Sequence, residues 1–385
     1  MTVQEAGVVT ACDLTVSYRK LAELTQEGER VTTWISRDAD DPGWDRFLQG
    51  TPLGQFQQST LWSKAKAAEG WRPIRVLIRA EEALIAGFQI MTRPAWRGFG
   101  RIGYVSKGPV VLPGRTWAAG YTADLLQQVV RREKLSALIV QPPDDCRQMA
   151  VALDACGFLP DFLTKVNDAT WVIDLNRDFA TIEANMGRTT RNLVRRGVKT
   201  GVTIRHGNCD DLARFFELML ATCRRQETKP NPPELRHLEA LWDAAAPSGN
   251  VQIFLAEYEG RVVAGLLAIL FGETVTLWKV GAAPPDKEVK PNDLMYHEAI
   301  RWAHQQGYRQ CDFAAFDRRM ALAILNGESL SEEQQRTRFL FLTRFGGRPS
   351  LLPSAQVFFP NPLWRALYRS RYRRRLSETP VSRPQ

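Results

Sequence analysis

The chain has 385 residues and a mass of 43.6 kDa, which is enough for two or three domains. Hydrophobic residues make up 44% of it and charged residues 24%, which excludes a disordered, collagenous or fibrous protein. Its 51 lysines and arginines against 42 acidic residues give a net charge of +9, which favours an anionic partner such as nucleic acid, a phosphorylated substrate or an acidic membrane face.

The first half of the chain predicts a leader followed by an α/β unit. Residues 1–30 have weak periodicity and predict a flexible or loosely docked leader. Hydrophobic periodicity then predicts strands over 34–36, 75–79, 84–93 and 137–140, and helices over 42–48, 58–68 and 116–134. A turn at 80–83 joins the two longer strands, and the prolines at 142 and 143 interrupt the pattern.

The second half repeats this order of elements. Strands are predicted over 171–175, 202–205, 251–258, 261–271, 274–280 and 310–313. One helix is predicted from 179 and continues into 188–199; others are predicted over 212–225 and over 293–306, and a further helix ends near 246. The succession strand, turn, strand, strand, helix, strand occurs once in each half, without identity between the residues. Each half combines an antiparallel hairpin with a βαβ step, so the predicted fold is α/β with mixed sheets.

Several common kinds of site find no support in the sequence. The segment Gly98-Phe99-Gly100 is too short for a dinucleotide fingerprint and opens no helix, and no serine lies in a GxSxG elbow. The histidines are too scattered for a metal site: they are His206, His237, His297 and His304. The six cysteines are widely spaced, as expected for reduced thiols. With no signal peptide and no long apolar run, we expect a cytoplasmic protein.

Three basic features remain as candidates for anion binding. The first is the end of a helix with Trp62, Lys64 and Lys66, and the third is the run of arginines over 369–375. In the second, one face of the helix 188–199 gathers five cations: Arg188, Arg191, Arg195, Arg196 and Lys199. Each feature is either a solvated face or a surface for phosphate or the RNA backbone, and the sequence pattern alone leaves both interpretations open.

Short motifs in a fixed order identify a resemblance. They are GQFQQSTLWSK at 54–64, GWRP at 70–73, YVSKGPV at 104–110, MGRTTRN at 186–192 with GV at 201–202, PNDLM at 291–295, AIRWA at 299–303, CDF at 311–313, FGG at 345–347 and NPLW at 361–364. Together they resemble the FemABX family, the peptidyltransferases that build peptidoglycan interpeptide bridges. The chain has no room for a long helical arm between 211 and 251, so it is similar to the armless, FemX-like members.

The resemblance implies a tandem pair of GNAT-like subdomains. We expect a leader at 1–30, a first subdomain at 31–167 that is completed by the tail 345–385, and a second subdomain at 168–344. Such enzymes transfer an amino acid, here Gly, Ala or Ser, from aminoacyl-tRNA to the side-chain amine of the stem peptide of UDP-MurNAc-pentapeptide or lipid II. No cofactor is implied because an aminoacyl ester is already activated. A monomer is expected, in peripheral contact with the inner membrane face.

The resemblance also implies roles for individual residues. Lys64 matches a helix lysine that contacts the diphosphate of the acceptor, and Lys229 replaces an arginine that precedes a proline. The remaining residues expected at the substrate are Trp62, Arg225 and Tyr104. The five cations of the helix 188–199 are the residues expected to bind tRNA.

Two family positions differ in this chain. Leu342 stands where the family has its catalytic lysine, three residues before Phe-Gly-Gly, and Gln141 stands where it has an acidic residue. A leucine can neither stabilise an oxyanion nor move a proton. The catalytic cation is therefore expected to be either Arg344 or Lys279. Arg344 would lie on the same face as Leu342 if the segment is extended.

Two other functions compete with this interpretation. One is an acyl-CoA-dependent N-acyltransferase of cell-envelope or exopolysaccharide metabolism, which is disfavoured because residues 280–285 lack the usual pyrophosphate loop. The other is a non-catalytic protein that binds RNA or a cell-wall precursor and has lost activity with the lysine.

Overall fold

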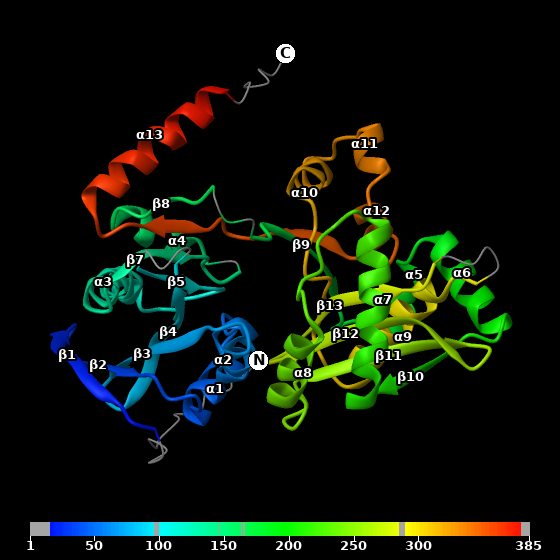
Figure 1. Ribbon diagram of the computed structural model, residues 1–385, viewed down its shortest axis with the longest axis horizontal. Helices are drawn as coiled ribbons and strands as arrows, with labels where there is room; N and C mark the ends of the chain where they lie inside the picture. The colour runs from blue at the N-terminus through cyan, green and yellow to red at the C-terminus, as the bar shows by residue number, and fades with distance from the viewer. Residues whose placement is uncertain are drawn as a thin grey trace. The chain divides into compact units, whose positions relative to one another are not determined.

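The computed structural model describes residues 16–95, 100–144, 146–162, 164, 166–284 and 289–378, and of 372–378 the backbone alone. The chain divides into two compact units (Figure 1). The first comprises Met1–Ser63, Gly70–Val166 and Pro353–Gln385, and the second comprises Lys64–Glu69 and Asn167–Leu352. Each unit is built on its own mixed sheet, so the predicted α/β class with tandem units is confirmed.

The first unit is a nine-stranded sheet with strand order β1-β2-β3-β4-β5-β7-β16-β8 and with β6 beside β4. Its strands are β1 (Arg19–Gln26), β2 (Glu29–Ser36), β3 (Arg72–Ala80), β4 (Ala83–Pro94), β5 (Arg101–Val105), β6 (Val110–Val111), β7 (Leu135–Val140), β8 (Leu159–Pro160) and β16 (Gln356–Phe358). Its helices are α1 (Pro42–Gln49), the 3-10 turn η1 (Phe56–Gln58), α2 (Thr60–Ala67), α3 (Thr116–Arg132), α4 (Arg147–Ala155) and α13 (Pro362–Glu378). The helix α2 ends among the residues that group with the second unit.

The parallel step of the first unit runs from β5 through α3 to β7. The two strands pair along the whole of β5, from Arg101 beside Leu135 to Val105 beside Val140. Apolar residues of α3, such as Leu126 and Val130, are fully buried in the core that this crossover covers. Parallel strands need such a crossover, and its apolar face stabilises the sheet by removing hydrocarbon from water.

The second unit is a seven-stranded sheet with strand order β10-β11-β12-β13-β14-β9-β15. Its strands are β9 (Ala169–Asp174), β10 (Thr203–Gly207), β11 (Val251–Tyr258), β12 (Arg261–Phe271), β13 (Thr274–Ala282), β14 (Gln310–Asp312) and β15 (Arg348–Leu351). Its helices are α5 (Phe179–Ala184), α6 (Arg188–Lys199), the 3-10 turn η3 (Cys209–Asp211), α7 (Leu212–Arg225), α8 (Leu235–Ala245), α9 (Pro291–Gln305), α10 (Arg318–Leu325), α11 (Glu332–Gln335) and α12 (Phe339–Thr343).

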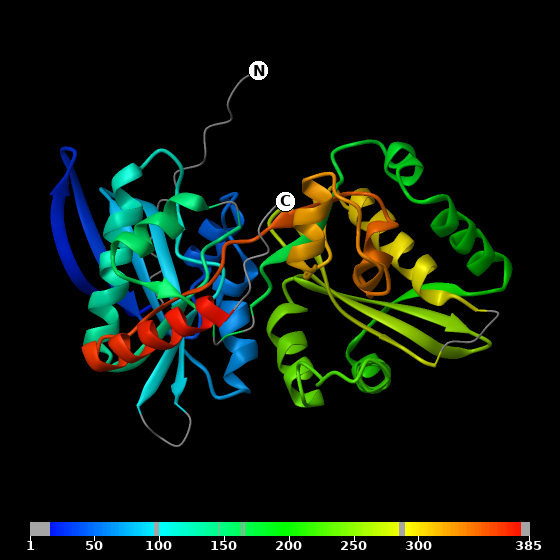
Figure 2. The same cartoon turned by 90° about the horizontal axis from the view of Figure 1, so that it is seen from above.

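Two helix layers cover the second sheet. Alternate residues of β12 point to opposite faces: Gly265 lies under Phe215 of α7, whereas Leu266 packs in the core with residues of α9. Figure 2 shows these helices on the two sides of the strands. The crossover α9 links β13 to β14, which is the same parallel step that α3 makes in the first unit.

The structure corrects two expectations about the ends of the subdomains. Part of the expected leader, Arg19–Gln26, is the strand β1, which pairs along its length with β2. The segment 348–351, expected in the first subdomain, forms β15 and pairs with β9 of the second sheet. The tail reaches the first sheet only at β16, which pairs with β7 and β8.

The FGG motif has a structural role at this return of the chain. Phe345 is fully buried against Tyr296 and Phe313. Gly347 has a φ of +88°, and a Cβ at this residue would lie 2.3 Å from the carbonyl oxygen of Val172. Only glycine fits both the positive φ and this close approach to β9.

None of the helices in the described ranges combines the length and the apolar character that crossing a bilayer requires.

Candidate functional site

The second sheet opens along β13. This strand pairs with β14 only from Thr274 to Thr276, and after Thr276 no strand in the described part of the chain continues the pairing on that side. Its other side remains paired with β12 up to Ala282. A free strand edge presents backbone N–H and C=O groups that can bond to an extended, amide-containing ligand.

A β-bulge lies in this open part of β13. Leu267 of β12 pairs with Lys279, and the next residue, Ala268, pairs with Leu277, so Trp278 is the extra residue. Bulges re-aim side chains and are common beside active sites. Because paired residues share a face, Lys279 lies with Leu267 on the face that α7 covers.

Lys279 is the most perturbed cation at this opening. Its ammonium lies 4.5 Å from the centre of the Trp278 ring, and no carboxylate in the described ranges forms an ion pair with it. Burial lowers its pKa to about 8, and the positive charges of Lys66 and Arg338 act in the same direction, against a smaller opposing effect of Cys223. A lysine with such a pKa exchanges a proton near neutral pH.

The end of α7 is fixed to the end of β13 beside this lysine. Arg225 donates to the carbonyl oxygen of Ala282 at 2.8 Å and to the hydroxyl of Thr222 at 3.1 Å. The Thr222 hydroxyl in turn accepts from the backbone N–H of Ala282 at 2.9 Å. The guanidinium of Arg225 therefore holds the end of β13 in place through its hydrogen bonds. Lys229, four residues further along the chain, is exposed.

Arg344 does not lie on an extended strand, so that expectation is wrong. Residues Phe339–Thr343 form the helix α12, and Arg344 is its C-cap. The backbone carbonyl of Arg344 accepts from the N–H of Gly187, the N-cap of α6, at 2.8 Å. Leu342 packs against the hydrophobic core of the unit. Arg344 and Lys279 thus lie against different elements.

Asp293 is an acidic group whose charge interacts with that of Arg344. It lies in the first turn of α9, where burial raises its pKa to about 6, and the Arg344 charge opposes that rise. Its Oδ1 is buried without a hydrogen-bond partner among the described residues. Asp293 belongs to the PNDLM motif, but burial is not visible in a motif, so the sequence did not identify it as a titrating group.

The basic face of α6 is formed as predicted. Thr190, Val194 and Gly197 are buried and pack the opposite side of the helix, with Gly197 against Leu294 of α9. Four of its cations are exposed and form no ion pair within the described ranges: Arg188, Arg195, Arg196 and Lys199. Arg191 differs, because it donates to the carbonyl oxygen of Ala184 at the end of α5 at 3.0 Å.

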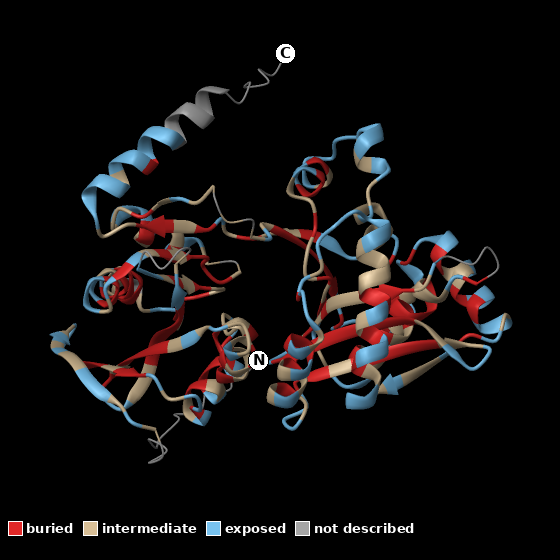
Figure 3. Cartoon of the chain, in the orientation of Figure 1, coloured by how far each residue is buried: buried red, intermediate tan, exposed pale blue. Residues whose placement is uncertain are grey.

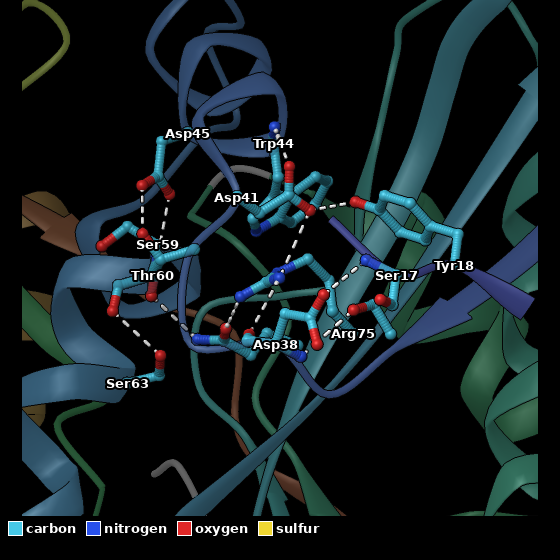
Figure 4. Close-up of polar contacts among 12 residues, drawn as sticks. Ser17, Tyr18, Asp38, Asp41, Trp44, Asp45, Ser59, Thr60, Ser63 and Arg75 are labelled. Carbon is cyan, nitrogen blue, oxygen red and sulfur yellow. Dashed lines mark hydrogen bonds and ion pairs between the residues drawn. The ribbon is translucent and has the colours of Figure 1, made fainter. Parts of the chain in front are cut away.

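In the first unit, a buried polar network holds the start of α2, the helix of Trp62 and Lys64 (Figure 4). Arg75 is fully buried, pairs with Asp41 at 3.2 Å and donates to the Gln89 side chain at 3.1 Å. Gln89 donates in turn to the carbonyl oxygen of Ser59 at 2.9 Å. The network fixes the segment that carries the first motif.

Gln58 joins the first motif to the YVSKGPV motif. Its side chain donates to the carbonyl oxygen of Ser106 at 2.8 Å and accepts from the N–H of Gln89 at 2.7 Å. A Cβ at Gly108 would lie 2.5 Å from its amide carbon. Tyr104 of β5 lies 3.5 Å from the Gln141 amide oxygen, and burial raises the pKa of its phenol. Both motifs therefore have a packing role beside any role in binding.

Comparisons with known proteins agree with this architecture. Residues 183–319 match the acetyltransferase (GNAT) domain model, and residues 40–156 match the FemAB family model. A lipid II:glycine glycyltransferase of Staphylococcus saprophyticus is 24% identical over 233 residues, which are 58% of this chain and 56% of that protein. The counterpart from Staphylococcus aureus is 23% identical over 229 residues, 56% of this chain and 53% of that protein. The match thus spans about half the length of these relatives.

A solved structure supports the same fold. The crystal structure of FemX superposes with a TM-score of 0.72 at 17% identity and covers 84% of this chain and 97% of that chain. The two mixed sheets, each with one parallel crossover, define a tandem GNAT-like protein. Within that class, these comparisons support a member of the FemABX family, as the motifs indicated.

Proposed function

We propose that this protein is an aminoacyltransferase that attaches an amino acid from aminoacyl-tRNA to the side-chain amine of the stem peptide of a peptidoglycan precursor. Its relatives named lipid II:glycine glycyltransferase support the class of reaction and favour glycine and a lipid-linked acceptor. The observation that carries the proposal is Lys279, a partly buried lysine with a pKa of about 8 at the open edge of β13.

The chemistry needs a proton carrier. The acceptor amine forms a bond to the ester carbonyl carbon, and the bond from that carbon to the ribose oxygen of tRNA breaks. Lys279 in its neutral form takes the proton from the attacking nitrogen and then returns it to the departing ribose oxygen. A pKa near 8 suits both steps because each form of the lysine is populated near neutral pH.

Holding the two substrates in place is the other contribution that the protein makes to the rate of transfer. The free edge of β13 offers backbone groups to the amide-rich stem peptide or to the aminoacyl group, and holding two reactants in place replaces a bimolecular encounter. Lys64 is proposed to hold the diphosphate of the acceptor, and the exposed cations of α6 to hold the tRNA backbone. Arg344 and Lys229 remain alternative cations for these substrates.

The decisive experiment incubates the full chain with charged tRNA and UDP-MurNAc-pentapeptide and measures the precursor by mass spectrometry. The expected product is heavier by one aminoacyl residue, and ribonuclease treatment beforehand should abolish it. Parallel reactions with glycyl-, alanyl- and seryl-tRNA identify the donor. A precursor of unchanged mass with every donor, in both its soluble and its lipid-linked form, would contradict the proposal.

The acyl-CoA-dependent reaction is the second candidate, and one observation favours it. Residues 183–319 match an acetyltransferase domain, and the opening of β13 lies within that range. A parallel incubation with acetyl-CoA tests it. A precursor that gains an acetyl group without tRNA would assign the opening to an acyl-CoA donor.

A further inference from the structure

The helix α13 exposes a cluster of large apolar side chains. Leu363 is 78% exposed, Trp364 59% and Leu367 45%. Leu367 is four residues from Leu363 and three from Trp364, so the three side chains are neighbours on the helix surface. Single exposed apolar residues need no explanation, but a contiguous group of three on two helical turns marks an interaction surface.

An adjoining side of α13 is fixed to the first unit. The hydroxyl of Tyr368 accepts from the N–H of Phe162 and donates to the carbonyl oxygen of Pro160, each at 3.1 Å, and its ring stacks on Phe162. Arg365 lies over the ring of Phe358 and donates to the carbonyl oxygen of Phe359 at 2.9 Å. Figure 3 shows the result, a helix that is exposed along most of its described length. These contacts hold the apolar cluster outward.

Uncompensated positive charge adjoins the apolar cluster. The sequence of α13 contains six arginines and one glutamate. Arg365, Arg369 and Arg371 form no ion pair within the described ranges, and the last two are exposed. The pKa of Arg365 is lowered by burial and by the charges of Arg369 and Arg131, which shows how closely the cations gather. An anionic partner would relieve this repulsion.

The combination of features selects one kind of partner. RNA would neutralise the arginines but leave the two leucines in water, and a second copy of the chain would bring two positive helices together. An anionic bilayer surface satisfies both features, since tryptophan and leucine enter the headgroup boundary while arginines meet acidic lipids. We propose that α13 is an interfacial anchor that docks the first unit on an anionic membrane through Leu363, Trp364 and Leu367.

This anchor stands on the geometry of α13 alone, yet it deepens the proposed function. A protein held at the surface would meet a lipid-linked acceptor by diffusion in two dimensions. The test therefore uses no substrate. Full-length protein is sedimented with vesicles of phosphatidylcholine alone or with about one-third phosphatidylglycerol. We expect at least roughly tenfold tighter binding to the anionic vesicles and a loss of that preference at high salt.

Two variants separate the apolar and the charged contributions. Leu363→Ser with Trp364→Ser and Leu367→Ser should weaken vesicle binding by roughly tenfold or more, because the inserted hydrocarbon is removed. Arg369→Gln with Arg371→Gln should remove roughly tenfold of the anionic preference. The matched control is Leu322→Ser with Leu325→Ser, two leucines of α10 that are 39% and 53% exposed. It should bind like wild type.

Other outcomes would overturn the anchor. Equal binding by wild type and the serine variant, or equal binding to neutral and anionic vesicles, contradicts it. A wild-type dimer that the serine substitutions dissociate, without vesicle binding, would assign the cluster to self-association. RNA binding that needs only the arginines, again without vesicle binding, would assign the helix to nucleic acid. Transfer to the soluble precursor is measured in a separate assay without membranes. The hypothesis of a membrane anchor and the hypothesis of a transferase activity can therefore be rejected independently.

Discussion

The two parallel steps of the molecule differ in how far their strands stay together. In the first unit β5 and β7 pair from Arg101 to Val105, the full length of β5. In the second, β13 and β14 pair only from Thr274 to Thr276 and then separate. The same βαβ connection therefore produces a closed sheet in one unit and an open strand edge in the other. The open copy is the one suited to hold an extended substrate.

The two units also differ in how they compensate a charge that is withdrawn from solvent. In the first, Arg75 is paired with Asp41 and hydrogen-bonded to Gln89, so the charge supports the fold. In the second, Lys279 faces other cations, and burial is the main cause of its depressed pKa. A partly buried charge without a counter-ion lowers stability, and such groups are frequent at functional sites.

The largest expected effect comes from replacing Lys279. Lys279→Met should lower kcat by about 10²–10⁴-fold, the usual contribution of a positioned acid–base group, with little change in either KM. Wild-type kcat should rise with pH through about 8 as the neutral amine forms. Lys279→Arg should lack this rise, because a guanidinium stays protonated. Steady-state rates measured between about pH 6 and about pH 9 would test both variants. A retained pH rise in Lys279→Arg would exclude Lys279 as the base.

The same substitution should stabilise the protein. The folded-state pKa of about 8 lies below the ordinary value of 10.5, so the ammonium is disfavoured by folding at every pH below 8. Removing it should raise the free energy of unfolding by about 3 kcal/mol at pH 7. The gain should shrink as the pH rises from 8 towards 10.5, where the wild-type folded state sheds the proton first. Denaturant unfolding at several pH values measures it; a destabilised Lys279→Met would contradict the assignment.

Arg75→Met should lower stability without lowering kcat, the reverse of the effects expected for Lys279→Met. It leaves Asp41 buried without its partner and should cost about 3–5 kcal/mol of stability, while the folded fraction keeps its kcat. Adding Asp41→Asn should recover part of that stability, because asparagine removes the charge and still caps α1 through the N–H of Trp44. Thermal unfolding and rates per folded molecule would show the difference. If Arg75→Met lowered kcat more than stability, the first unit would have a direct catalytic role.

Lys64→Ala should act on binding and not on the chemical step. Removing a charge-assisted hydrogen bond to a diphosphate costs about 1.5–3 kcal/mol, so the KM for the acceptor should rise about tenfold to a hundredfold at nearly constant kcat. Lys20→Ala, which removes an exposed lysine of β1, is the control and should leave both constants unchanged. Wild-type kinetics in Lys64→Ala would remove this residue from the site.

The sequence predicted the fold better than the site, for physical reasons. Hydrophobic periodicity is a local property, so it located β12 and the basic helix α6 and indicated that each half holds one parallel step. The opening of β13 depends on pairing with β14, a strand that follows only after the whole of α9, and no local pattern reports it. The segment at 339–343 was misjudged because its apolar residues suit a strand or a short helix equally. The exposed cluster Leu363, Trp364 and Leu367 was missed, since only the docking of Tyr368 shows which side of α13 faces outward.

The smallest expected effect concerns the exposed cations of α6. Three arginines of the first unit are paired with glutamates: Arg30, Arg37 and Arg115. The exposed cations of α6 in the second unit have no such partners in the described ranges. If they hold the tRNA backbone, Arg195→Ala with Lys199→Ala should flatten the log–log salt dependence of tRNA binding by roughly one unit for each phosphate that is no longer neutralised.

The control for this surface is Arg236→Ala, because Arg236 is an exposed arginine of the same unit that is paired with Glu234 at 2.9 Å. Its removal should leave the slope unchanged, since counterion release depends on cations that bind phosphate and not on net charge alone. Arg191 is unsuited to the test because its replacement would also free the carbonyl oxygen of Ala184. Fluorescence anisotropy with labelled tRNA over a salt series measures each slope. An identical slope in wild type and in the Arg195 and Lys199 double variant would mean that this face of α6 is solvated and that tRNA is held by other cations.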